Sequence, residues 1–210
     1  MKIDSFLDMM SGGPRWMLRV QEILGYLIYA DGPGGWFIYL HGPPQTGKSL
    51  FCHLVQHVAA PQPCCHLTAL NFGRWEMASV LDSEIVIADC GLPPRRHESM
   101  YARLMGLIAG EDQIYETKND PKAKMKRPRA RWVIVDNEAI SCIRSPAFRS
   151  RAIAMPFTAP LGSTMVGCNL LDTLREIDRE ASLPWIHAGW QRVQQNAGFT
   201  VLDTSKMAEA

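Results

Sequence analysis

The fold of this chain is decided by the stretch Gly42-Pro43-Pro44-Gln45-Thr46-Gly47-Lys48-Ser49. It matches in full the pattern G-x-x-x-x-G-K-[ST]. The backbone N–H groups of such a loop form a nest for an anion, and the positive end of the helix that follows adds to it. In this pattern the lysine reaches the β- and γ-phosphates of a nucleotide, and the hydroxyl binds Mg²⁺. The stretch therefore predicts that Lys48 binds the phosphates of ATP and that Ser49 binds Mg²⁺.

The segments on both sides of the loop agree with this interpretation. Residues 36–40 are a short apolar run, typical of a buried parallel strand, and a helix should start near Lys48. Further apolar runs at residues 84–88, 131–135 and 152–155 predict three more strands, separated by helical segments. We expect an α/β fold with a mostly parallel sheet flanked by helices. An ordinary strand–turn–helix connection is the alternative interpretation of the loop.

Length and composition limit the other possibilities. The 210 residues fit one ATPase core at residues 35–160, with a helical lead-in at 1–34 and a C-terminal helical segment at 161–210. The last segment should break near Pro184. The net charge of +1 excludes a global attraction to nucleic acid but allows a local basic patch. No apolar run approaches the length of a membrane span, so we expect a cytoplasmic protein with reduced cysteines and no membrane partner.

Polar residues at the ends of the predicted strands are candidates for ATP hydrolysis. Asp89 follows the strand at 84–88 and could hold Mg²⁺ with Ser49, although the next residue is Cys90 and not a second acid. Asn137 follows the strand at 131–135 and could contact the γ-phosphate or the attacking water. Arg149 and Arg151 could stabilise the transition state from a neighbouring subunit. The alternatives are a turn or helix cap for the acid and the amide, and surface charge for the arginines.

A basic segment precedes the strand at residues 131–135. Within residues 118–131 the only acid is Asp120, and prolines 121 and 128 exclude a regular helix. A basic hairpin there would bind a phosphate backbone in a sequence-tolerant manner, whereas the alternative is a solvated charged loop. The cations of this segment are Lys118, Lys122, Lys124, Lys126, Arg127, Arg129 and Arg131.

Together these features resemble the superfamily 3 helicases of AAA+ type, in particular the helicase domain of phage, plasmid and poxvirus-type primase-helicases. The resemblance covers nearly the whole chain, and the order and spacing of its parts support it. Besides the loop, the matching stretches are residues 6–7 and 21–26, Arg74-Trp75 to Leu81, 110–114, 133–137, 148–157, and 170 through Trp185 to Phe199.

The resemblance implies roles for individual residues. Asp89 would be the Walker B acid and Asn137 the sensor asparagine. Arg151 would be the second arginine of the family's pair, in which Ser150 replaces the first and Arg149 could substitute for it. The lysines of the basic segment would line the pore of a hexameric ring that binds single-stranded or forked DNA. Because a primase domain and a winged-helix domain are missing from the pattern, a separate primase or origin-binding protein is an expected partner.

Three functions remain open from the sequence. The first is an ATP-dependent DNA helicase or translocase in the replication of a mobile element. The second is an ATP-switched adaptor or loader with weak hydrolysis, which Cys90 favours. The third is a small-molecule kinase, for which the basic segment would have no role.

Overall fold

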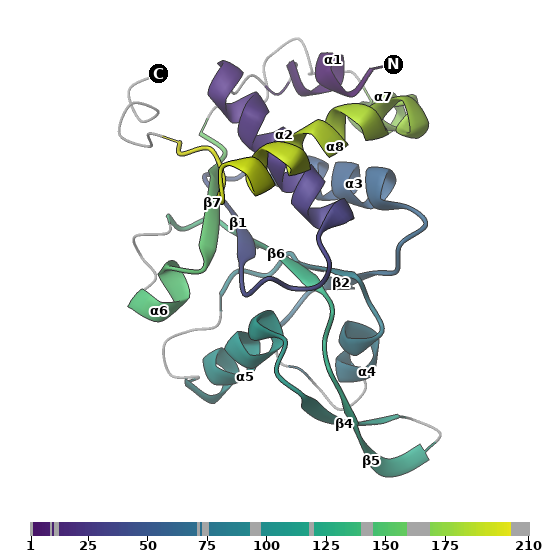
Figure 1. The fold of residues 1–210 in the computed structure, drawn as a ribbon, viewed down its shortest axis with the longest axis vertical. Helices are drawn as coiled ribbons and strands as arrows, with labels where there is room; N and C mark the ends of the chain where they lie inside the picture. Colours follow the sequence, from purple (N-terminus) through teal and green to yellow (C-terminus); the bar gives the residue numbers. More distant parts are fainter. Residues whose placement is uncertain are drawn as a thin grey trace. The chain divides into compact units, whose positions relative to one another are not determined.

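The computed structural model of the chain describes residues 2–8, 10, 13–70, 72, 76–92, 98–117, 120–139, 145–158 and 169–202 (Figure 1). The chain forms two compact units, and each is assembled from separate segments of the sequence. The first unit comprises Met1–Ala30, His41–Ala60 and Met155–Ala210, and the second comprises Asp31–Leu40 and Pro61–Ala154. The division into a lead-in, a core and a C-terminal segment stays a prediction.

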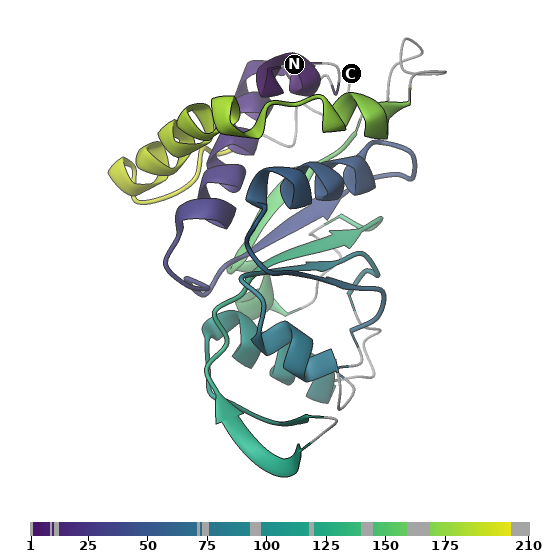
Figure 2. The same cartoon turned by 90° about the vertical axis from the view of Figure 1, so that its right-hand side faces the viewer.

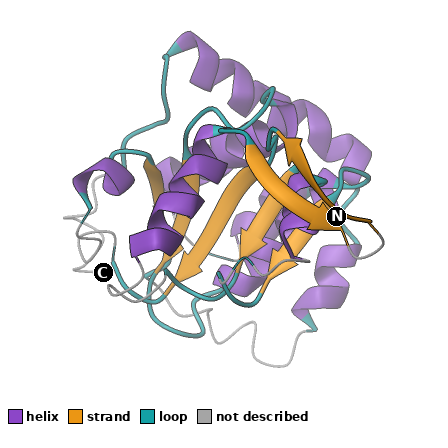
Figure 3. Ribbon diagram, turned by 90° about the horizontal axis from the view of Figure 1, so that it is seen from below, coloured by secondary structure: helices purple, strands orange, loops and turns teal. Residues whose placement is uncertain are grey.

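A five-stranded sheet confirms the α/β fold. Its strands, orange in Figure 3, follow the order β2-β3-β6-β1-β7, and the pairs β2–β3 and β3–β6 are parallel. Strand β2 was missed by the sequence pattern because its exposed and partly exposed residues give no apolar run. The strands are β1 Phe37–His41, β2 Cys64–Leu67, β3 Ile85–Ala88, β6 Arg131–Asp136 and β7 Ala152–Pro156.

The core of the second unit lies between this sheet and short helices. Side chains of β3 and β6, among them the fully buried Val86 and Trp132, pack with Leu104 and Phe148. The continuous apolar runs of these strands are explained by this burial, which leaves no polar face. The helices are α4 Glu76–Leu81, α5 Glu98–Ala109 and α6 Pro146–Arg149. The helix expected from Trp75 is thus described from Glu76, and Trp75 itself lies outside the described residues.

The second unit also carries an antiparallel hairpin, formed by β4 Gln113–Thr117 and β5 Asp120–Lys126. In Figure 2 this hairpin, drawn in teal, extends beyond α4 and α5. A hairpin in the basic segment is therefore confirmed. Pro121 is compatible with β5 because each strand of a two-stranded sheet has an edge without ladder partners.

Helices make up most of the first unit, as α1 Ile3–Asp8, α2 Gly13–Tyr29, α3 Lys48–Ala59, α7 Leu170–Arg175 and α8 Arg179–Gln195. The break expected near Pro184 is wrong, since α8 runs through this proline and begins after its N-cap Asp178. Packing of α8 against α2 outweighs the one backbone bond that a proline removes. Among the described residues, no helix is long and apolar enough to cross a membrane.

Candidate nucleotide site and basic hairpin

The loop between β1 and α3 has the backbone conformation of a tight anion cradle. Three of its residues have positive φ angles, with 139° at Gly42, 64° at Gln45 and 95° at Gly47. A Cβ atom at Gly42 would lie 2.0 Å from the carbonyl oxygen of Phe157, so only glycine fits this position. The two glycines of the motif are thus required by the backbone, and Gln45 accepts a left-handed conformation between them.

Lys48 lies inside the loop. Its Nζ atom donates to the carbonyl oxygens of Gly42 and Pro43 at 2.6 Å each, and the residue is buried. The hydroxyl of Thr46 donates to the same Pro43 oxygen at 2.8 Å. These bonds hold the ammonium group against the backbone at the start of the loop.

The donors of the loop fit the phosphates of a nucleotide. Helix α3 begins at Lys48, and its N-cap Gly47 offers no side-chain acceptor to the first N–H groups of the helix. Such N–H groups and the helix dipole favour an anion. Ser49, in the first turn, is exposed and places a hydroxyl of the kind that binds Mg²⁺. The residues present therefore fit a triphosphate with its Mg²⁺.

An aromatic group supports the loop from within the first unit. Phe157 contacts Phe51 of α3 and Trp16 of α2, with ring centroids 5.8 Å and 5.7 Å apart. Its N–H donates to the carbonyl oxygen of His41 at 2.8 Å, directly before the loop. The backbone of Phe157 therefore lies against Gly42 and leaves no room for a side chain there. The sequence pattern contained no local signal for this contact.

In the second unit, Asp136 joins the segments that follow β3 and β6. Its carboxylate accepts from the N–H of Leu92 at 2.9 Å and from the N–H of Glu138 at 3.1 Å. The hydroxyl of Tyr39 donates to the carbonyl oxygen of Glu138 at 2.9 Å. Asp89 and Asn137 are located on these two segments. Asp136 is thus a positioning residue that the sequence analysis missed, because an Asp-Asn pair also begins ordinary turns.

Cys90 stands where a second acid would be expected. Partial burial and, to a lesser extent, the charges of Asp89 and Asp136 together raise the pKa of its thiol to about 11. The thiol therefore stays protonated at neutral pH. It provides neither a carboxylate nor a thiolate beside Asp89.

The two candidate arginines lie around the end of α6. Ser145 caps this helix by accepting from the N–H of Phe148, and Arg149 is its last, exposed residue. Arg151 follows the turn, is partly buried, and accepts from the N–H of Phe37 through its backbone oxygen at 3.1 Å. The backbone contact fixes the position of Arg151 against β1.

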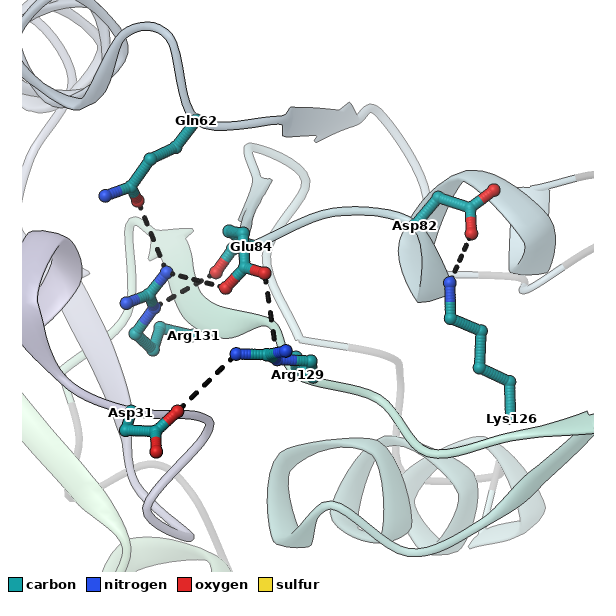
Figure 4. A network of polar contacts seen from close by, with 7 residues as sticks. All are labelled: Asp31, Gln62, Asp82, Glu84, Lys126, Arg129 and Arg131. Atoms are coloured by element: carbon teal, nitrogen blue, oxygen red, sulfur yellow. Dashed lines mark hydrogen bonds and ion pairs between the residues drawn. The ribbon is translucent and has the colours of Figure 1, made fainter.

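Several cations of the basic segment bind the second unit itself. Lys126 pairs with Asp82 at 2.5 Å, and Arg127 donates to the carbonyl oxygen of Gly110 at 2.9 Å. Arg129 lies 3.7 Å from Glu84, which also binds the buried Arg131 at 3.1 Å (Figure 4).

These contacts anchor the base of the hairpin. Asp31 and Gln62 complete the network around Arg129 and Arg131. Lys122 and Lys124 are exposed on β5, whereas Lys118 lies outside the described residues. The cations predicted from the sequence to bind DNA thus differ in their surroundings: Lys126 and Arg127 bond within the second unit, and Lys122 and Lys124 are exposed.

Comparison with known proteins finds solved structures with a similar fold. No protein-family model matches the chain. No curated protein matches it either. The chain is similar to two structures of the NrS-1 C-terminal region. The first is 18% identical, with a TM-score of 0.57, and covers 91% of this chain. The second is 15% identical, with a TM-score of 0.56, and covers 92% of this chain. This chain covers 43% and 49% of those chains, less than half of each. A JCV helicase structure is 11% identical, with a TM-score of 0.46 and coverage of 93% of this chain and 63% of that one.

Proposed function

We propose that this chain is an ATP-dependent DNA helicase or translocase motor that acts in the replication of a phage, plasmid or other mobile element. The observation that carries the proposal is the loop at residues 42–49. Its positive-φ backbone, the helix start without a side-chain cap, and the ammonium group of Lys48 held against the loop backbone all suit a triphosphate. The fold shared with the NrS-1 C-terminal region is consistent with it.

Each candidate residue has a role in this proposal. Lys48 would bind the β- and γ-phosphates, and Ser49 and Asp89 would be ligands of Mg²⁺, which would neutralise charge on the phosphates. Asn137 orients the attacking water. Arg151, or Arg149, reaches the nucleotide of the next subunit in a hexameric ring and stabilises the transition-state charge.

DNA binding is assigned to the basic hairpin. Single-stranded or forked DNA would pass along the exposed lysines of β5, and the other cations would keep the hairpin in place. A separate primase or origin-binding protein would load the motor. The proposed residues are Lys118, Lys122, Lys124, Lys126 and Arg127.

The rate of ATP hydrolysis, measured with and without single-stranded DNA, tests the motor. We expect stimulation by DNA in the wild-type protein, and loss of both basal and stimulated hydrolysis in Lys48→Ala, because the ammonium group compensates charge on the transferred phosphate. Lys2→Ala, a change at an exposed lysine outside the loop, is the matched control. A wild-type protein that neither responds to DNA nor separates a forked substrate would contradict the motor.

A second candidate function is an ATP-switched adaptor or loader with weak hydrolysis. The observation that favours it is Cys90, whose protonated thiol replaces a second acid beside Asp89. In this case ATP would change the affinity for a protein partner while turnover stayed very slow. The adaptor would be excluded if DNA accelerated ATP turnover and no protein partner bound in an ATP-dependent manner.

A further inference from the structure

The indole of Trp16 bonds to the end of strand β7. Trp16 lies in helix α2 and is buried, and its Nε1–H donates to the carbonyl oxygen of Pro156 at 3.2 Å, across 140 positions of the sequence. Pro156 is the last residue of β7, and the next residue, Phe157, is the one whose backbone lies against Gly42. The bond from Trp16 is therefore one residue away from the contact with the loop at residues 42–49.

The direction of the backbone explains why the carbonyl of Pro156 needs a partner outside the sheet. Strand β7 ends the strand order of the described sheet, with β1 as its neighbour. Phe157 donates its N–H to the carbonyl oxygen of His41 in β1, and its own carbonyl oxygen lies on the same side, against Gly42. Successive carbonyls of a strand point to opposite sides, so that of Pro156 is directed away from β1.

This outer edge of β7 is held by helix α2. Proline has no N–H, so Pro156 offers its carbonyl alone at this edge, and the indole of Trp16 satisfies it. The ring of Trp16 also meets the ring of Phe157 edge-on, at 5.7 Å between centroids and an interplanar angle of 83°. A hydrogen bond and a ring contact thus fix two successive residues of the chain from the same side chain.

We propose that Trp16 is a positioning residue for the phosphates of the nucleotide, because its indole N–H fixes the end of β7 and thereby the start of the phosphate-binding loop. This inference rests on the proposed binding of ATP by the loop. A Cβ atom at Gly42 would lie 2.0 Å from the carbonyl oxygen of Phe157, so the two backbones are in direct contact. A shift at the end of β7 therefore displaces Gly42, and Trp16 acts on the nucleotide through this contact.

Calorimetric titration of ATP with Mg²⁺ compares the wild type with Trp16→Phe, which keeps an aromatic ring and loses the N–H donor. Affinity for ATP should fall about threefold to tenfold, the size of one lost hydrogen bond, in a protein that stays folded. Trp190→Phe is the matched control, because it removes an indole of α8 that contacts Tyr26 of α2 at 6.2 Å between centroids. Its affinity for ATP should equal that of the wild type.

Hydrogen exchange shows whether the effect passes through β7. The N–H of Phe157, bonded to His41, should exchange faster in Trp16→Phe. The N–H of Thr200, bonded to Glu22 of the same helix α2, is the internal reference and should exchange as in the wild type. If Trp16→Phe fails to fold, a benzothiophene in place of the indole, introduced at an amber codon, retains the shape of the ring system and removes the N–H.

Three outcomes would overturn the inference. In the first, a folded variant without the N–H binds ATP as tightly as the wild type. In the second, affinity for ATP falls while the N–H of Phe157 exchanges at the wild-type rate, so the effect does not pass through β7. In the third, Trp190→Phe weakens ATP binding as much as Trp16→Phe does. A wild-type protein that binds no ATP would instead contradict the proposed function, and the inference would fall with it.

Discussion

At the scale of single residues, Asp136 fixes the relation between two segments that carry candidate catalytic groups. Its carboxylate accepts two backbone N–H groups, from Leu92 and from Glu138. Removing an acceptor from a partly buried N–H costs the desolvation of that group. Loss of the Asp136 carboxylate should therefore destabilise two segments, the one that follows Asp89 and the one that follows Asn137.

For Asp136→Ala we predict a loss of about 1–3 kcal/mol in the free energy of unfolding, and faster hydrogen exchange at the N–H groups of Leu92 and Glu138. ATP hydrolysis should slow while nucleotide affinity is retained. Asp136→Asn keeps one carbonyl oxygen as an acceptor, so its free energy of unfolding should fall by less. Glu138→Ala is the control, because only the backbone of Glu138 takes part in these bonds. Wild-type exchange rates in Asp136→Ala would refute the positioning role.

The thiol of Cys90 gives a prediction about pH. Its pKa is raised to about 11, so the protonated form predominates below that pH and the reactive thiolate is scarce. At pH 8 only about one thiol in a thousand should be ionised, and alkylation by iodoacetamide should rise about tenfold per pH unit up to pH 10. In Asp136→Asn a negative charge is lost, the pKa falls, and the reaction at fixed pH should be faster.

Peptide mapping by mass spectrometry measures this rate for Cys90 alone. Glutathione in the same solution provides the reference rate of an unperturbed thiol. If Cys90 reacts as fast as glutathione at pH 8, the raised pKa is wrong and a thiolate stands beside Asp89.

At the scale of elements, helices α2 and α8 of the first unit approach each other closely at two glycines. A Cβ atom at Gly25 would lie 2.6 Å from the backbone nitrogen of Trp190, and one at Gly189 would lie 2.3 Å from the carbonyl oxygen of Gln21. Buried Glu22 accepts from the N–H and the hydroxyl of Thr200, which ties the segment after α8 to α2. Backbone meets backbone at this crossing, so the helices must shift to admit a methyl group.

We predict that Gly25→Ala and Gly189→Ala each lower the free energy of unfolding by about 1–3 kcal/mol, as overpacked sites do. The gain of about 1 kcal/mol that alanine brings to a helix works in the opposite direction and should be outweighed. Gly198→Ala is the matched control, since the nearest atom to its Cβ would be 4.0 Å away. Denaturant unfolding gives the comparison, and a Gly25→Ala protein as stable as the wild type would show that the crossing is loose.

The elements also show what the sequence could and could not predict. The strands β3 and β6 were predictable because burial on both faces leaves an unbroken apolar run in each. Edge strand β2 was not predictable, since its residues are largely exposed and their partners in β3 lie 21 positions further along the sequence. Likewise, the loop at 42–49 has a local signature, whereas the contacts of Phe157 and Asp136 depend on segments that only folding brings together.

At the scale of the whole molecule, both units are assembled from separate segments, so no linear boundary follows from the pattern of apolar runs. The nucleotide loop belongs to the first unit, and the hairpin belongs to the second. In a motor, ATP bound at the loop must change the affinity of the hairpin for DNA. The proposal thus makes ATP binding at the loop the first event on which all others depend.

Calorimetric titration of ATP with Mg²⁺ into the protein tests this claim most directly. We predict saturable binding of one ATP per chain in the wild type, and a loss of at least tenfold in affinity in Lys48→Ala, because a charge-assisted contact with the phosphates contributes about 1.5–3 kcal/mol. The Lys2→Ala control should bind ATP like the wild type. A wild-type protein that takes up no ATP, or a Lys48→Ala protein that binds it with unchanged affinity, would contradict the assignment of residues 42–49 as the phosphate cradle.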